Sequence, residues 1–399
     1  MGALDEFRAE TRAWLDENCP QSMRVPESED NMIGGGKKQV YTNPDSKLWL
    51  DRMASKGWTA PMWPVEYGGG GLSKDESLIL QDELIRIDAR SPISGMGFSM
   101  IGPTLLDYGT DEQKEEHLPK ITRGEIRWCQ GYSEPGAGSD LASLQTRCED
   151  KGDHYLVNGQ KIWTSGAQYA DWIFTLVRTE PQAPKHEGIS FVLIDMDQPG
   201  VTVKPIKLIS GGSPFCETFF DDARCEKNDL VGQLNRGWTV GKRLLQHERS
   251  SISGLNSAGR RGRYDTMGTL PEVAKRYVGE IKGKIAETAL RESVVINTMN
   301  QKAFNLTQRR AMEENENGGT PTFATSMFKY YGSETSQQRL EIQLKALGTQ
   351  SLGWEGDTFK EEEKTLTRTW LRSKASTIAG GSSEIQLNII AKRVLGLPD

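Results

Sequence analysis

The sequence predicts an α+β protein built from three consecutive parts, helical over residues 1–125, rich in strands over 126–236 and helical again over 237–399. Two observations carry this prediction. Apolar residues recur at helical spacing in the first and third parts, whereas short apolar runs separated by turn-forming residues fill the middle part. With 399 residues, 36% of them hydrophobic, the chain can bury a sizeable core in parts of this size.

The first part is predicted to be helical because its apolar residues share helix faces. The two clearest faces are those of Leu4, Phe7, Thr11 and Leu15, and of Leu78, Leu80, Leu84 and Ile85. A glycine run at residues 68–71 interrupts the pattern. It lacks the Gly-Lys-Ser/Thr ending of a phosphate loop and no strand clearly precedes it, so we expect a structural loop.

The middle part contains two runs typical of strands, at residues 173–177 and 189–194. The pair Asn158-Gly159 is typical of a tight hairpin turn, here between residues 155–157 and 161–163. Such a hairpin places Trp163 on a strand. Without its neighbours in the sequence, Trp163 would simply be interpreted as a core residue.

Residues 130–141 combine glycines and small hydroxyl residues around one proline. A backbone with few β-carbons can approach a planar or phosphorylated ligand closely and present its N–H groups to it. An aromatic residue beside this segment suits a flat cofactor. A dinucleotide-binding fold around residues 136–138 is disfavoured, because the third glycine and the strand–helix–strand alternation are missing.

Composition excludes several classes of function. The net charge of −6 and the absence of a dense basic run argue against nucleic-acid and membrane-surface partners, and no apolar run approaches the roughly 20 residues of a membrane span. No histidines are paired at metal-ligand spacing, so we expect no metal site. Five scattered cysteines without a Cys-x-x-Cys motif favour buried free thiols and a cytoplasmic protein: Cys19, Cys129, Cys148, Cys216 and Cys225.

The third part carries a candidate base. One helix has an apolar stripe formed by Val240, Leu244, Leu245, Ile252 and Leu255, and Glu248 lies within that stripe. An apolar environment raises the pKa of a carboxyl group by desolvation and so strengthens it as a base. The alternative for Glu248 is a surface carboxylate paired with a neighbouring cation. Near the C-terminus, Ser382 or Ser383 is expected to cap a last helix that turns Ile385, Ile389 and Ile390 inward.

Three motifs, at residues 133–140, 158–165 and 380–386, together resemble the signatures of the acyl-CoA dehydrogenase family. The resemblance spans essentially the whole chain. It implies a helical N-terminal domain, a β-barrel middle domain and a C-terminal helical bundle. It also implies FAD-dependent formation of an α,β double bond in an acyl-CoA thioester, with electrons passed to an electron-transfer flavoprotein.

The same resemblance assigns residues to the cofactor and the substrate. Those implied to bind FAD are Gln130, Tyr132, Ser133, Gly138, Ser139, Trp163, Ser165, Ser382 and Glu384. Those implied to bind the acyl-CoA are Ser139, Arg249 and Gly380. Many members carry the catalytic glutamate where this chain has Gly380. A second subset carries it in a Glu-Arg pair on an earlier helix, which here is Glu248-Arg249, so the resemblance also implies Glu248 as the base.

The chain departs from the family where one subunit usually contacts its neighbour's cofactor. Residues 263–268 lack the usual arginine loop, and residues 345–349 lack the usual glutamine and paired glycines. This pattern resembles subunits of heterotetrameric acyl-CoA dehydrogenases from bacterial steroid side-chain catabolism, so we expect a hetero-oligomer, with a homo-oligomer as the alternative. Two further functions stay open, a catalytically silent partner subunit and a flavin oxidase or monooxygenase. The sequence leaves the acyl group open.

Overall fold

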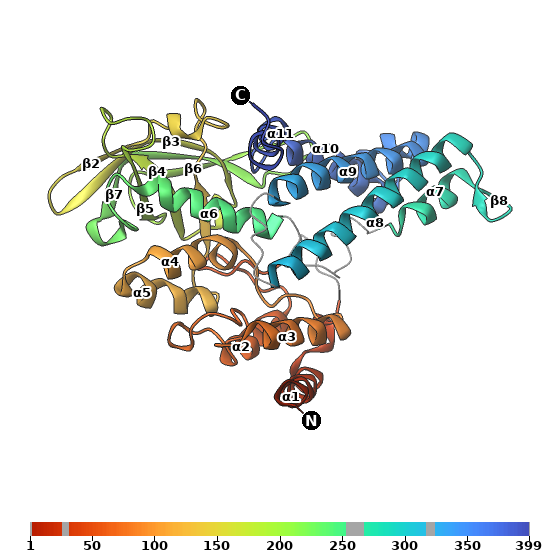
Figure 1. Ribbon diagram of the computed structural model, residues 1–399, viewed down its shortest axis with the longest axis horizontal. Helices are drawn as coiled ribbons and strands as arrows, with labels where there is room; N and C mark the ends of the chain where they lie inside the picture. Colours follow the sequence, from red (N-terminus) through yellow and green to blue (C-terminus); the bar gives the residue numbers. More distant parts are fainter. Residues whose placement is uncertain (1, 26–31, 253–266, 317–323, 399) are drawn as a thin grey trace. The chain divides into compact units, whose positions relative to one another are not determined.

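The computed structural model describes residues 2–25, 32–252, 267–316 and 324–398. Side chains are not described for residues 247–252, 312–313, 315–316 and 324. The chain forms two compact units, one of residues 1–206 with 214–247 and one of residues 207–213 with 248–399. Figure 1 shows the elements of both units.

The first unit begins with helices α1 (Ala3–Asn18), α2 (Pro44–Ser55), α3 (Lys74–Arg86), α4 (Gly102–Tyr108) and α5 (Asp111–Thr122). Side-chain caps fix where several of them start. Asn43 accepts a hydrogen bond from the Asp45 N–H and Pro44 opens α2, while Ser73 and Thr110 form capping boxes at α3 and α5. The helical prediction for this region is confirmed. Leu4 and Leu78 are nevertheless 44% exposed, so they lie at the edge of the predicted faces rather than within them.

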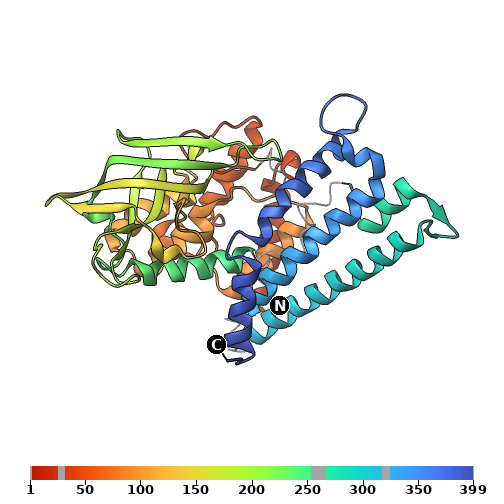
Figure 2. The same ribbon diagram turned by 90° about the horizontal axis from the view of Figure 1, so that it is seen from above.

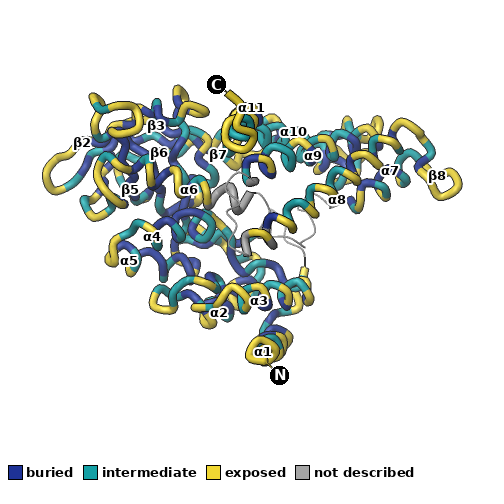
Figure 3. Tube along the Cα trace, in the orientation of Figure 1, coloured by how far each residue is buried: buried dark blue, intermediate teal, exposed yellow. Residues whose placement is uncertain are grey.

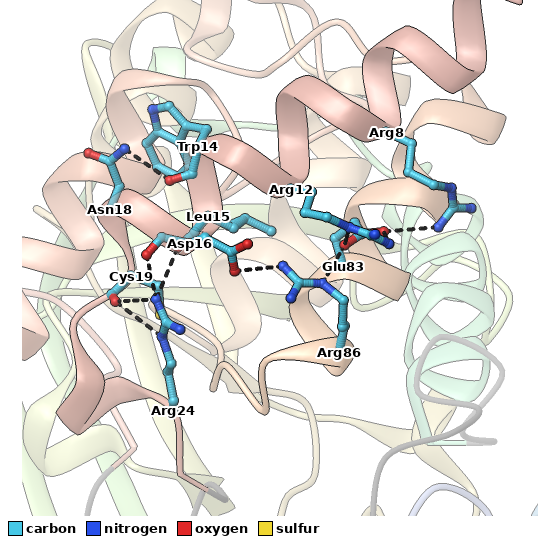
Figure 4. Close-up of polar contacts among 10 residues, drawn as sticks. All are labelled: Arg8, Arg12, Trp14, Leu15, Asp16, Asn18, Cys19, Arg24, Glu83 and Arg86. Carbon is cyan, nitrogen blue, oxygen red and sulfur yellow. Dashed lines mark hydrogen bonds and ion pairs between the residues drawn. The ribbon is translucent and has the colours of Figure 1, made fainter. Parts of the chain in front are cut away.

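A buried carboxylate joins α1 to α3 (Figure 4). Glu83 is 1% exposed and accepts hydrogen bonds from Arg12 at 2.9 and 3.0 Å, from Arg8 at 3.2 Å and from Arg86 at 2.6 Å. The hydrogen bond from Arg12 lowers the pKa of Glu83 most, and those from Arg86 and Arg8 add to it against the opposing effect of burial. The pKa falls to about 2. Glu83 is therefore a charged crosslink between two helices.

The glycine run at residues 68–71 is a structural loop, as expected. The Gly69 backbone passes so close to residue 63 that a β-carbon there would lie 2.2 Å from the Trp63 carbonyl oxygen. The Gly71 N–H also donates to that carbonyl oxygen at 3.0 Å. The glycines are explained by this close backbone approach.

The middle of the chain forms one curled sheet. Its strands are β1 (Trp128–Gly131), β2 (Arg147–Asp150), β3 (His154–Ser165), β4 (Trp172–Arg178), β5 (Ile189–Asp195), β6 (Val201–Ile206) and β7 (Phe215–Glu226). The order is β1-β4-β2-β3-β7-β6, with β5 also paired to β4. Strand β1 runs parallel to β4, whereas β3–β7, β4–β5 and β6–β7 are antiparallel.

The predicted strands at 173–177 and 189–194 are confirmed as β4 and β5, and both of their faces are buried. Phe174 and Leu176 join a core cluster with residues of α4, α5 and α6. Ile173 and Val177 join a second cluster with residues of β3 and β7. Because both faces are covered, these strands read as continuous apolar runs rather than as alternating ones.

The predicted hairpin turn at Asn158-Gly159 is wrong, because β3 runs straight through it. The pairing of β3 with β7 shifts register between Val157 and Gly159, so the pair forms a bulge. The Asn158 side chain exchanges two hydrogen bonds with Asp222 on β7, at 2.8 and 2.9 Å. A β-carbon at Gly159 would lie 2.7 Å from Thr146 Oγ1. The glycine therefore serves a close approach inside a strand.

Helix α6 (Gly237–Ile252) leads from the first unit into the second. The second unit contains α7 (Leu270–Val278), β8 (Glu280–Ile281), β9 (Lys284–Ile285), α8 (Thr288–Glu316), α9 (Ala324–Leu347), α10 (Glu361–Ser373) and α11 (Ser383–Ile389). Helix α9 is central to this unit, since it packs against α7, α8, α10 and α11. Figure 2 shows α8 and α9 side by side, and Figure 3 shows that β8 is exposed.

The last helix starts as predicted but is oriented differently. Ser382 caps α11 and accepts a hydrogen bond from the Ile385 N–H at 3.4 Å. The buried residues of α11 are Ser383 and Gln386, whereas Ile385 is 37% exposed. The prediction that Ile385 points inward is therefore wrong. The polar pair Ser383 and Gln386 is buried because it bonds the neighbouring backbone and Glu334.

Candidate functional site

Residues 133–140 follow β1 and form a tight turn, which we call the cradle. The Glu134 N–H donates to the Ala137 carbonyl at 2.9 Å, and the Ala137 N–H donates back to the Glu134 carbonyl at 3.0 Å. Pro135 and Gly136 occupy the two central positions of this turn. The two residues that follow this turn, Gly138 and Ser139, are exposed.

The glycines of the cradle face open space. A β-carbon at Gly136 or Gly138 would meet no atom within 4 Å, and neither residue has a positive φ. Neither packing nor backbone conformation within the described chain therefore requires glycine there. The N–H groups of Gly138 and Ser139 also make no hydrogen bond within the described residues. Room and free donors together fit a flat, phosphate-bearing ligand that approaches the backbone closely.

Trp163 lies beside the cradle on β3. The Ile162 N–H donates to the Ser133 carbonyl at 2.8 Å, so the strand that carries Trp163 is bonded to the first residue of the cradle. The Trp163 side chain is 51% exposed, and its ring meets the Phe215 ring edge-on at 6.0 Å. The core interpretation of Trp163 is wrong. Its backbone has a φ of +62°, a left-handed conformation that is unfavourable for a bulky residue and recurs at functional sites.

The other predicted cofactor residues of the first unit lie close to these two. Gln130 is half-buried on β1, and Ser165 ends β3 opposite Phe215. The Tyr132 side chain, by contrast, is 5% exposed and packs edge-on against Phe174 and Phe191. Tyr132 therefore points into the core, and only its backbone can face a ligand.

A buried ion pair beneath the cradle escaped the sequence predictions. Lys161 is fully buried and its Nζ lies 2.7 Å from Glu134 Oε1. Burial disfavours the Glu134 charge, but Lys161 and hydrogen bonds from Thr146 and Gln145 outweigh it and lower the pKa of Glu134. Burial lowers the pKa of Lys161 despite the attraction of Glu134. Both residues stand in the matched motifs, but nothing in their spacing of 27 positions signals a contact.

A pocket of about 300 Å³ adjoins the cradle and is lined by Ala142, Ser143, Gln145, Arg178, Pro181, Ala183 and Lys185. The Arg178 guanidinium is buried and donates to three backbone carbonyls, those of Ala142, Leu144 and Lys185. Lys185 pairs with Asp140 of the cradle, which also accepts a hydrogen bond from Ser143. Two cations thus line this pocket. The sequence predictions missed both, because they lie far from the motifs along the chain.

The C-terminal motif forms a turn in the second unit. Gly380 and Gly381 have φ values of +65° and +89°, which glycine adopts readily. The Gln386 side chain donates to the Gly380 carbonyl at 3.1 Å, and a β-carbon at Gly381 would lie 2.5 Å from the same amide nitrogen. Glu384 is exposed, and backbone and Ser382 hydrogen bonds lower its pKa. The structure therefore brings Gly380, Ser382 and Glu384 into one turn.

The candidate base lies on α6, but its side chain is outside the described residues, as is that of Arg249. The described part of the apolar stripe is as predicted, since Val240 and Leu244 are buried and Leu245 is half-buried. Ile252 and Leu255 fall outside the described side chains, as does most of the segment 263–268. The segment 345–349 ends α9 and continues into a single turn at Gly348, whose φ is +57°.

Within the described ranges, no group of three or more His, Cys, Asp or Glu residues is placed to hold a metal ion. None of the described helices is long and apolar enough to cross a membrane. All five cysteines are buried and free.

Comparison with known proteins matches three family models in succession. They are the acyl-CoA dehydrogenase N-terminal domain over residues 3–125, the middle domain over 129–223 and the C-terminal domain over 235–395. The chain is 37% identical to acyl-CoA dehydrogenase IpdE1 of Mycolicibacterium smegmatis, with all of this chain and 99% of that protein covered. It is 36% identical to IpdE1 of Mycobacterium tuberculosis, with coverage of 100% and 99%.

Solved structures agree with these sequence matches. The structure of the ChsE4-ChsE5 complex from Mycobacterium tuberculosis is similar, with a TM-score of 0.75, 29% identity and coverage of 100% of this chain and 98% of that one. The Tcur3481-Tcur3483 steroid acyl-CoA dehydrogenase gives a TM-score of 0.77 at 30% identity, with 99% and 98% covered. With helical, curled β-sheet and helical regions in the family's order, this chain belongs to the acyl-CoA dehydrogenase family of flavoprotein oxidoreductases.

Proposed function

We propose that this acyl-CoA dehydrogenase binds FAD in the cradle and oxidises the α,β carbon–carbon bond of an acyl-CoA thioester to the 2-enoyl-CoA. The observation that carries the proposal is the open space above Gly136 and Gly138 beside the exposed, strained Trp163. Those three features have no structural purpose within the described chain, and a flat, phosphate-bearing cofactor gives them one.

The residues present fit FAD. The free N–H groups of Gly138 and Ser139 would hold the diphosphate, and Trp163 with Ser165 would flank the flavin ring. Backbone groups of Gln130, Tyr132 and Ser133 would contact the ring edge, and Ser382 with Glu384 would supply the contacts of the C-terminal turn. When bound, FAD accepts the hydride that leaves the substrate's β-carbon.

Glu248 is proposed as the base that takes the α-proton. Its helix presents an apolar stripe, and a carboxylate in such surroundings is a stronger base because desolvation raises its pKa. A backbone N–H near Gly380 would polarise the thioester carbonyl and stabilise the charge that develops on it. Arg249 and Ser139 would hold the acyl-CoA.

The pocket beside the cradle supports a CoA thioester as the substrate. Arg178 and Lys185 supply positive charge, and Lys185 is paired with Asp140 of the cradle. Phosphate groups are the part of an acyl-CoA that such cations recognise. We therefore assign this pocket to the phosphate-bearing end of the CoA moiety.

For the acyl group and the assembly we propose a steroid-related thioester and a hetero-oligomer with a second acyl-CoA dehydrogenase subunit. The support comes from relatives: one similar structure is a steroid enzyme and another is a two-chain complex. The missing glutamine and paired glycines at residues 345–349 point the same way. An electron-transfer flavoprotein is the proposed electron acceptor. Five buried free thiols fit the reducing cytoplasm as the location.

The test is purification of the protein, with its partner subunit if one is needed, followed by denaturation and identification of the released cofactor. We expect a yellow protein that releases non-covalent FAD and whose flavin is bleached by an acyl-CoA. FMN, or a colourless protein even with partner and added FAD, would contradict the proposal. Rapid oxygen consumption with substrate would instead favour an oxidase, and activity unaffected by Glu248 substitution would favour a silent partner subunit.

A further inference from the structure

The cradle lies within a longer loop, residues 132–146, which leaves the sheet after β1 and ends just before β2. Buried groups tie the two ends of this loop together. Glu134 stands at its start and accepts four hydrogen bonds or ion-pair contacts. They come from Lys161 Nζ at 2.7 Å, the Thr146 N–H at 3.0 Å, Thr146 Oγ1 at 2.6 Å and the Gln145 N–H at 2.6 Å.

Lys161 ties the same point to strand β3. Its Nζ also donates to the Tyr132 carbonyl at 3.2 Å, so one ammonium group holds both the end of β1 and the carboxylate of the cradle. The Arg178 guanidinium donates hydrogen bonds to the Ala142 and Leu144 carbonyls in the later part of the loop. The backbone N–H of Arg178 donates to the Thr146 carbonyl at 2.7 Å. The loop between these anchors, residues 135–141, contains the residues that face open space.

The same lysine stands where β3 departs from regular geometry. In a regular strand, residues two apart point to the same face. Lys161 is fully buried, whereas Trp163 is 51% exposed. The pairing of β3 with β7 shifts register between Lys161 and Thr164, and this irregularity turns Trp163 outward. Lys161 is the last buried anchor before that change.

We infer that the Glu134–Lys161 pair positions the cofactor site, fixing the cradle and the Trp163 strand at the separation that a flavin requires. Stability alone is a weak reason to keep such a pair, because replacing a buried ion pair by apolar residues is often neutral or favourable. Ordering a ligand-binding loop costs conformational entropy. A pair that orders the loop before the ligand arrives removes this entropic cost from binding. Glu134 and Lys161 are positioning residues, which act through the backbone they hold. The inference rests on the proposed flavin function.

The test compares FAD binding and folding in full-length protein with its partner, if one is needed. The variants are Lys161→Met, Glu134→Gln and the double variant that removes both charges. Glu83→Gln is the matched control, since it also breaks a buried carboxylate network but lies between α1 and α3. The dissociation constant of FAD is measured by fluorescence titration of the apoprotein, below the melting temperature of each variant. The visible circular dichroism of the bound flavin reports its fixed geometry.

We expect the cradle variants to weaken FAD binding about 10- to 100-fold and to alter the visible dichroism, as lost supporting contacts and small misplacements do elsewhere. Glu83→Gln should melt at a lower temperature yet keep wild-type FAD affinity. Folded Lys161→Met and Glu134→Gln proteins with wild-type affinity and dichroism would overturn the inference.

A second measurement needs neither a variant nor a cofactor. In the wild-type apoprotein, the amides of Gln145, Thr146 and Ile162 should exchange with solvent far more slowly than those of Gly138 and Ser139. Equal exchange rates would overturn the inference even if the variants fail to fold. A wild-type protein that binds no FAD would refute the proposed function, whereas the exchange rates would still decide whether the pair fixes the loop.

Discussion

At the scale of single residues, the immediate partners of each buried titratable group determine whether that group is charged. Glu83 holds its charge because three arginines surround it, and Lys161 holds its charge against burial because Glu134 stands 2.7 Å away. His117 has the opposite environment. It is 1% exposed between the rings of Trp128 and Trp172, and neither ring nitrogen has a hydrogen-bond partner among the described residues.

We predict that Glu83→Gln lowers the free energy of unfolding by about 3 kcal/mol at neutral pH, because it removes the buried negative charge that accepts hydrogen bonds from Arg8, Arg12 and Arg86. Denaturant unfolding measures this. The pKa of Glu83 is depressed to about 2, so its contribution is present above the unfolded value near 4.5 and is lost as the pH falls through 2. Asp82→Asn is the control, since Asp82 is exposed and should contribute less than about 1 kcal/mol. An equal loss of unfolding free energy in both variants would contradict the interpretation of Glu83 as a crosslink between α1 and α3.

We predict that His117 makes the enzyme less stable in mild acid. Burial lowers the pKa of His117 to about 4, so between that pH and its ordinary value near 6.5 the unfolded state binds more protons than the folded state. As the pH is lowered through this window, the free energy of unfolding should therefore fall by up to about 1.4 kcal/mol per pH unit. His117→Phe should lose that slope. Identical pH profiles for the two proteins would show that folding does not lower the pKa of His117.

At the scale of elements, the strand β3 joins folding to function. It is hydrogen-bonded to the cradle through Ile162, carries the buried Lys161 and then exposes Trp163, whose backbone is left-handed. Strained residues of this kind persist where the surrounding structure holds them in place. Strand β3 therefore exposes the Trp163 ring at the expense of backbone strain at that residue.

We predict that Trp163→Gly separates the two roles of this position. Glycine adopts the φ of +62° without strain, and an exposed ring contributes little burial, so the unfolding free energy of the apoprotein should change by less than about 1 kcal/mol. The dissociation constant of FAD should rise about 10-fold or more, because ring stacking is lost. Unchanged FAD affinity in Trp163→Gly would contradict the assignment of Trp163.

The elements that the sequence predicts well are those decided by local chemistry. The strands at 173–177 and 189–194 follow from burial on both faces, and the start of α11 follows from the Ser382 cap. Asn158-Gly159 misleads because the same dipeptide also suits a bulge, which here depends on Asp222, 64 residues away. The Glu134–Lys161 pair, Arg178 and Lys185 stay hidden for the same reason. Their roles depend on tertiary contacts that no local pattern records.

At the scale of the whole molecule, the chain has the family's helical, β-sheet and helical regions over nearly its full length. Its departures concern assembly. Residues 345–349 lack the glutamine and paired glycines with which family members reach a neighbour's cofactor. We therefore propose that a homodimer of this chain lacks contacts on the FAD diphosphate.

We predict that full flavin loading requires a second acyl-CoA dehydrogenase subunit. A lost charge-assisted contact of about 1.5–3 kcal/mol corresponds to a roughly 10- to 100-fold weaker FAD affinity in a homo-oligomer. Native mass spectrometry of the chain expressed alone and with related dehydrogenase genes measures both composition and flavin content. A stable, fully flavinated and active homo-oligomer would contradict the prediction.

We propose that this enzyme removes an α-proton with Glu248 while bound FAD takes up the hydride. Anaerobic mixing of the flavin-loaded enzyme with a panel of acyl-CoA thioesters, from short branched to steroid, tests it most directly, with bleaching of the flavin absorbance as the signal. Wild-type enzyme and the control Glu226→Gln, an exposed carboxylate paired with Arg224, should bleach at the same rate with the preferred thioester. Glu248→Gln should keep its FAD but bleach about 10²-fold more slowly or worse, the usual loss for a missing general base. Near-normal bleaching by Glu248→Gln would contradict the claim.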